Sequence, residues 1–83
     1  MNKQNVLKEA DFFINLKEKL GERIKDLRKE RGLNQIQTAE ALKIDKSTIA
    51  KYETDVSAPS VFLLIDLAEF FEVSTDYLLG LEE

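Results

Sequence analysis

Residues 35–53 read QIQTAEALKIDKSTIAKYE, and this stretch decides the fold that the sequence predicts. It holds two helical segments of about eight residues each, with very few residues between them. Asn34 and Gln37 have the spacing of a capping box at the start of the first segment, and Asp45 is suited to cap the second. Because so short a turn forces the two helices to cross steeply, we predict a helix-turn-helix at residues 35–53.

The second helix of this pair, expected at residues 46–53, should have one apolar and one polar face. At about 100° per residue, Ile49 and Tyr52 turn to one side, and Ile49 can fill the wedge between the helices together with Leu42 and Ile44. The opposite side carries Lys46, Ser47, Ala50 and Lys51. A polar outward face is what a recognition helix needs to enter the major groove of DNA.

Helical patterns also occur on both sides of this stretch. One helix is expected before it, and Gly32 can end that helix. Its apolar face comprises Phe13, Leu16, Leu20, Ile24 and Leu27. Ser60 and Ser74 suit the N-caps of two later helices. The wide apolar face expected for the first of these comprises Val61, Leu64, Ile65, Ala68 and Phe71. No alternating strand pattern is present, so we predict an all-α fold of five short helices.

The composition excludes several kinds of chemistry. The 83 residues are enough for one small domain, and they include no cysteine and no histidine. This excludes disulfides, thiolate metal sites and the commonest catalytic base, and there is no glycine-rich phosphate loop. We therefore expect no enzyme activity, no metal and no cofactor. The longest apolar run, residues 61–65, is far shorter than a membrane span, and we expect a cytoplasmic, nucleoid-associated protein.

Charge is divided unevenly along the chain, whose formal net charge is −4. Residues 17–53 carry ten basic and seven acidic side chains, whereas residues 54–83 carry seven acidic side chains and no basic one. One end of the molecule is therefore mildly basic and can face phosphates, although the whole chain is acidic.

The chain resembles the helix-turn-helix DNA-binding domain of phage-repressor and Cro type, often called the XRE family. The matching stretches are LGERI, RKERGLNQ, STIAKYE, APS and DYLLG, which begin at residues 20, 28, 47, 58 and 76. They cover about residues 16–81 in the family's order, and this range is identified as the DNA-binding domain. Residues 1–15 exceed the usual family length, and we expect an N-terminal extension that is either a helical arm or a frayed terminus.

The resemblance implies a five-helix, lambda-repressor-like domain that binds a double-stranded operator as a symmetric homodimer. The residues expected to read base edges are Lys46, Ser47, Thr48, Ala50 and Lys51. The residues expected to contact phosphates are Gln35, Lys43, Thr54, Ser57 and Ser60. Arg28 and Glu53 match a family pair that forms a buried salt bridge between the first and third helices.

Three residues depart from the family pattern. Lys43 stands where a glycine is usual, so a left-handed conformation there would cost on the order of 1 kcal/mol; alternatively the lysine gains a phosphate contact. Thr38 replaces a more usual leucine, which thins the packing beneath the second helix. Asp55 replaces a common glycine in a loop that has no basic residue of its own.

The last two expected helices hold more apolar residues than one small core can bury, which suggests a partner surface. We expect this acidic end to form a two-fold dimer. The candidate interface residues are Phe62, Phe70, Val73, Leu79, Leu81 and, from the N-terminal extension, Phe13. As an alternative to an interface role, Phe62 and Phe70 could lie in the core, where Phe71 is expected.

The function expected from the sequence is sequence-specific regulation of transcription, in the simplest case by a repressor that occludes a promoter. The alternative is an antitoxin, or a phage or mobile-element accessory protein, that acts mainly through a protein partner. Binding that weakens steeply as salt rises would favour DNA. Because no small-molecule ligand domain is evident, we expect control to come from a regulatory protein partner, proteolysis or concentration.

Overall fold

The computed structural model describes residues 3–82 and, within them, the side chains from residue 11 onward. Five helices follow one another along this range: α1 (Lys3–Glu30), α2 (Gln35–Leu42), α3 (Lys46–Glu53), α4 (Val61–Phe71) and α5 (Thr75–Leu78). No β-strand occurs between residues 3 and 82, and the predicted all-α, five-helix fold is confirmed.

Side-chain caps define where three of the helices begin. The Asn34 side chain accepts a hydrogen bond from the backbone N–H of Gln37 (2.7 Å), and the Gln37 side chain accepts one from the backbone N–H of Asn34 (2.9 Å). This is the predicted capping box. Ser60 and Ser74 each accept a backbone N–H in the first turn of the helix that follows. Asp45 differs, because it occupies the N-cap of α3 in an extended conformation without a capping hydrogen bond from its side chain.

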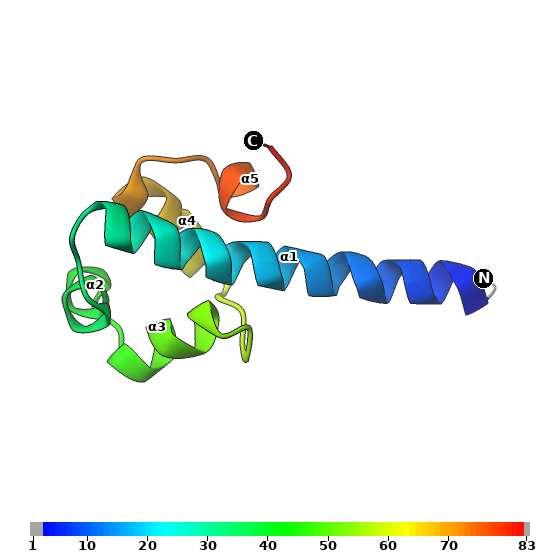
Figure 1. Ribbon diagram of the computed structural model, residues 1–83, viewed down its shortest axis with the longest axis horizontal. Coiled ribbons are helices and arrows are strands. Elements are labelled where there is room, and N and C mark those ends of the chain that lie inside the picture. The colour runs from blue at the N-terminus through cyan, green and yellow to red at the C-terminus, as the bar shows by residue number, and fades with distance from the viewer. Residues whose placement is uncertain (1–2, 83) are drawn as a thin grey trace.

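The core lies between the second half of α1 and the other helices, with α2 and α3 on one side of α1 and α5 on the other (Figure 1). Its buried apolar residues come from all five helices and are Leu20, Ile24, Leu27, Ala39, Ile49, Tyr52, Leu67, Ala68, Phe71 and Leu78. Thr38 is also fully buried, and its hydroxyl donates to the backbone oxygen of Asn34 (3.0 Å). A leucine, which is usual at this position, has no such hydroxyl, and the hydrogen bond satisfies the one that Thr38 buries.

Gly21 allows α1 to lie unusually close to the end of α3. A Cβ atom at this position would lie 2.5 Å from the backbone oxygen of Tyr52 and 2.6 Å from the Asp55 carboxylate. Glycine is otherwise unfavourable inside a helix, so its presence here is explained by this close approach.

α4 buries only part of the face predicted for it, namely Ala68 and Phe71 with Leu64 packed against the core. Val61 and Ile65 were expected to face the core, but both are exposed. The residues of α4 that are buried are Leu67, Ala68 and Phe71. Phe62 is 81% exposed, so its alternative assignment to the core is wrong. The helix sequence VFLLIDLAEFF is apolar on most sides, and periodicity therefore could not select which side faces inward.

α1 is longer than the region it packs against. Figure 1 shows its N-terminal half running beyond the other four helices as a single rod. Phe13 was expected to continue the apolar face of Leu20 and Ile24, but it is 65% exposed. The helix passes residue 16 without a break.

One side chain of α1 holds the segment that follows α5. Arg23 Nη1 donates to the backbone oxygens of Tyr77 (2.6 Å) and Glu82 (2.8 Å), and its guanidinium lies over the Tyr77 ring, 4.1 Å from the centroid. Gly80, with a φ of 76°, turns the chain between these two contacts. The end of the described chain therefore lies against α1.

Candidate nucleic-acid interface

α3 buries one face and exposes the other. Ile49 and Tyr52 lie in the core, which orients the rest of the helix outward. The predicted base-reading residues that are exposed are Lys46, Ser47 and Lys51. Thr48 and Ala50 are half-buried at the edge of that face. The exposed face is polar and carries two lysine donors, which can reach guanine O6 and N7 in a major groove.

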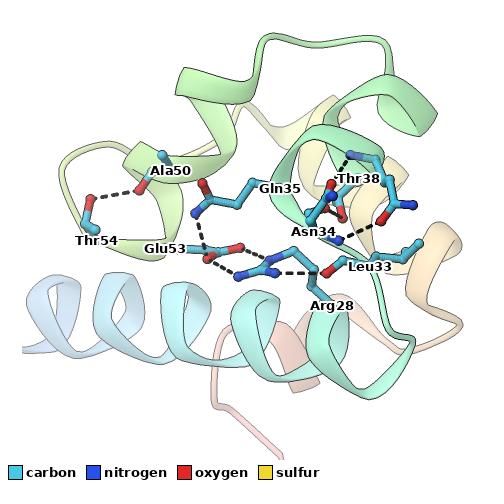
Figure 2. A network of polar contacts seen from close by, with 9 residues as sticks. Arg28, Leu33, Asn34, Gln35, Thr38, Ala50, Glu53 and Thr54 are labelled. Atoms are coloured by element: carbon cyan, nitrogen blue, oxygen red, sulfur yellow. Dashed lines mark hydrogen bonds and ion pairs between the residues drawn. The ribbon is translucent and has the colours of Figure 1, made fainter.

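The orientation of α3 is held by an ion pair with α1 (Figure 2). Arg28 Nε lies 2.7 Å from Glu53 Oε2, and Arg28 Nη2 lies 3.0 Å from Glu53 Oε1. The pair is almost fully buried, with side-chain exposures of 11% and 3%. The remaining guanidinium nitrogen donates to the backbone oxygen of Leu33 (2.9 Å), which joins the α1–α2 connection to the same group. The hydrogen bond that Arg28 donates to Glu53 raises the pKa of the guanidinium, which remains charged.

Gln35 belongs to this network as well as to the predicted phosphate site. Its side-chain nitrogen donates to Glu53 Oε1 (3.1 Å), as Figure 2 shows. An amide nitrogen carries two hydrogens, which leaves one for a phosphate oxygen. The sequence reasoning placed Gln35 at the DNA surface and missed that it also braces the Arg28–Glu53 pair.

Ile36 was also missed. It is exposed, and with Gln35 and Lys46 it lines a shallow depression of about 320 Å³ between the starts of α2 and α3. An apolar residue at the second position of a helix, outside the pattern of buried residues, was the signal that could have identified it.

Lys43 forms the bend of the helix-turn-helix. Its φ of 59° and ψ of 43° lie in the left-handed region, and its backbone N–H donates to carbonyls at the end of α2. The side chain is exposed. The strain that the sequence suggested is therefore present, and the ammonium group is at the same time free to approach a phosphate.

The loop between α3 and α4 offers fewer donors than predicted. The Thr54 hydroxyl donates to the backbone oxygen of Ala50 (2.8 Å), so its proton is already engaged (Figure 2). Ser60 caps α4 by accepting a hydrogen bond, which leaves its own proton to donate. Ser57 is half-buried. Of these three predicted phosphate contacts, Ser60 is best placed to donate.

Asp55 occupies the left-handed position for which the family uses glycine, with a φ of 65°. Its Oδ1 atom is buried and has no hydrogen-bond partner in the described part of the chain. The carboxylate lies against Gly21, where a larger residue would collide with it. Gly21 and Asp55 therefore set how closely α1 and α3 approach, a role that spacing and composition did not reveal.

Among the residues that the structure describes, no group of three or more acidic side chains is arranged to hold a metal ion. No helix in the described range is long and apolar enough to cross a membrane.

The fold and the exposed polar face of α3 together define a helix-turn-helix domain. The sequence profile of the HTH_3 helix-turn-helix family matches residues 24–78, and the chain belongs to this family. The resemblance to the XRE type is thereby confirmed, and the family consists of regulators that are not enzymes.

Similar proteins are described as regulators of transcription. The HTH-type transcriptional regulator ImmR of Bacillus subtilis is 41% identical over 64 residues, which are 77% of this chain and 50% of ImmR. AnsR of the same organism is 40% identical over 62 residues, 75% of this chain and 53% of AnsR. The crystal structure of an HTH_3 family transcriptional regulator from Vibrio cholerae matches with a TM-score of 0.71 at 26% identity, over 83% of this chain and 39% of that one. The chain thus spans about half the length of the curated relatives it matches.

Proposed function

We propose that this chain is a sequence-specific DNA-binding regulator of transcription that inserts α3 into the major groove of an operator. It acts as a homodimer on a palindromic site and represses by occluding a promoter. The observation that carries the proposal is the division of α3 between a buried apolar face and an exposed face bearing Lys46, Ser47 and Lys51.

The electrostatics of the molecule support DNA as the partner. The seven acidic side chains of residues 54–83 lie beyond α3 in the chain, on the segment that forms α4 and α5. Lys43, Lys46 and Lys51 are all exposed on the helix-turn-helix itself. These lysines belong to residues 17–53, which carry three more basic than acidic side chains, and such a region attracts phosphates even though the net charge of the chain is −4.

The test is to select bound fragments from a random pool of duplex DNA and to titrate the winning sequence by fluorescence anisotropy. Replacing both recognition lysines (Lys46→Ala with Lys51→Ala) should weaken binding to that sequence by at least about 30-fold, since each base contact contributes about 1–3 kcal/mol. The melting temperature should hardly change, because both side chains are exposed.

The matched control removes the same charge from exposed positions on α1 (Lys25→Ala with Lys29→Ala). This variant should select the same sequence as the unmodified protein. Two results would contradict the proposal: no sequence enriched from the pool, or equal losses from both double variants. Binding that does not weaken as salt rises would instead favour a protein partner over DNA.

A further inference from the structure

Three consecutive large apolar side chains are exposed on α1 ahead of the core. Phe12, Phe13 and Ile14 are 52%, 65% and 52% exposed, and the two phenylalanine rings meet edge to face with centroids 6.2 Å apart. Consecutive residues of a helix point in directions about 100° apart, so the same domain cannot cover all three. We call these residues the α1 flank.

A hollow lies next to the α1 flank. It has a volume of about 310 Å³ and is formed where the segment after α5 lies against α1. Its apolar walls are Phe12 and Leu16 on one side and Leu79 and Leu81 on the other. Leu81 is itself 53% exposed. We call this hollow the corner cavity.

We propose that the α1 flank and the corner cavity are two halves of one self-complementary interface, and that its occupant is a second copy of this chain. A two-fold axis would place the flank of each copy against the corner cavity of the other. An isologous contact of this kind requires a protrusion and a recess on the same surface, and α1 carries both, adjacent to each other. The inference rests on the homodimer of the proposed function and identifies the surface that forms it.

Charge favours this surface over α4. Residues 11–19 carry Asp11 and Glu18 against Lys17 and Lys19, and the segment after α5 adds Glu82, so the contact brings together charges of both signs. The exposed apolar residues of α4, by contrast, belong to a segment with seven acidic side chains and no basic one. Two copies that met through α4 would repel each other.

The same geometry links association to helix formation. The N-terminal half of α1 extends beyond the other helices (Figure 1), and a short helix without tertiary contacts is marginal in water. A partner copy lying along this part would supply the missing contacts. We therefore expect the helical signal of the chain to fall on dilution as the dimer dissociates.

The test is sedimentation equilibrium of the full chain without DNA, alongside circular dichroism over the same concentrations. The unmodified chain should be dimeric at about 50 µM, well above a micromolar Kd. Phe13→Glu, on the flank, and Leu81→Glu, on the wall of the cavity, should each raise the dimer Kd at least about 30-fold. Phe62→Glu is the matched control, because Phe62 is the most exposed phenylalanine and lies on α4; its Kd should not change.

The outcomes separate this inference from the proposed function. A monomeric unmodified chain, a Phe13→Glu variant that stays dimeric, or a Phe62→Glu variant that dissociates would each overturn the assignment of the interface to α1. A cooperative melting transition of each variant shows that it still folds, although loss of the dimer contact lowers its melting temperature. Loss of DNA preference in the Lys46 and Lys51 variant is measured separately and does not depend on which surface dimerises.

Discussion

At the scale of single residues, the bend between α2 and α3 carries a strain that a different residue would relieve. Lys43 adopts a left-handed conformation that only glycine takes up without cost. We expect Lys43→Gly to be more stable than Lys43→Ala by about 1 kcal/mol, because both lose the charge and only glycine loses the strain. Urea unfolding measures the difference.

The same pair of variants tests the predicted phosphate contact. If Lys43 binds a phosphate, both variants should lose affinity for DNA by a similar factor and show a smaller dependence on salt. Equal stability of the glycine and alanine variants would contradict the strain, and an unchanged salt dependence would contradict the contact.

Tyr52 makes the stability of the domain depend on pH in the alkaline range. Burial raises the pKa of Tyr52 above its ordinary value of 10.0, because the phenolate is poorly solvated in the core. The unfolded chain therefore loses this proton at a lower pH than the folded chain does. The stability contribution is complete below pH 10.0 and is lost as the pH rises through the folded-state pKa.

The expected result is a free energy of unfolding that falls as the pH is raised past 10.0. Tyr52→Phe is the control, and its free energy of unfolding should fall less steeply over the same range because it lacks the group whose pKa is raised by burial. Identical slopes for the two proteins, measured by urea unfolding at several pH values, would show that Tyr52 is not responsible.

The exposure of residues on α3 was predictable from the sequence, whereas their hydrogen bonds were not. Periodicity places Ile49 inward and Lys51 outward because a helix repeats its directions regularly. The bonds from Gln35 to Glu53 and from Thr54 to Ala50 depend on distances across several elements. Gly21 is similar, since only the packed structure shows which backbone atom approaches it.

At the scale of elements, the Arg28–Glu53 pair joins α1 to α3 and makes the recognition helix part of the core. Removing one partner leaves the other charge buried and unpaired, which costs about 3–5 kcal/mol. We therefore expect Arg28→Met or Glu53→Leu alone to destabilise the domain by about 3 kcal/mol in urea unfolding.

Combining the two substitutions (Arg28→Met with Glu53→Leu) should restore more than half of the lost stability, because no unpaired charge remains. This double variant should still bind DNA less well than the unmodified protein, since Gln35 also loses its partner on Glu53. Strictly additive losses in stability would show that the two side chains do not act as a pair.

The bounds of α2 and α3 could be predicted because capping residues mark both starts and a short turn separates them. The buried face of α4 could be predicted only in part, because nine of the eleven residues in VFLLIDLAEFF are apolar and several stripes are equivalent. For α1, the pattern of apolar residues identified the helix but not where its packing stops. That point depends on how far the other helices reach, which is a property of the assembled fold.

At the scale of the whole molecule, the uneven charge distinguishes the helix-turn-helix, which exposes lysines, from the acidic segment that follows it. The helix-turn-helix exposes lysines, and the segment from residue 54 onward carries only acidic charge. The net charge alone argues against DNA as a binding partner. The uneven distribution of charge along the chain is what makes DNA a plausible partner. The distribution places repulsion between phosphates and the acidic segment wherever α4 approaches the duplex, which favours one docking orientation over others.

Because α1 continues through residue 16 without a break, it fixes the distance between the two ends of the helix. From Phe13 on the α1 flank to Arg28, which anchors α3, the helix rises about 22 Å at about 1.5 Å per residue. In the proposed dimer a continuous helix, and not a flexible linker, therefore sets the distance between each recognition helix and the two-fold axis. The length of α1 would then determine the spacing of the two DNA half-sites. An operator with a different spacing would have to bend or untwist before the dimer could bind both half-sites.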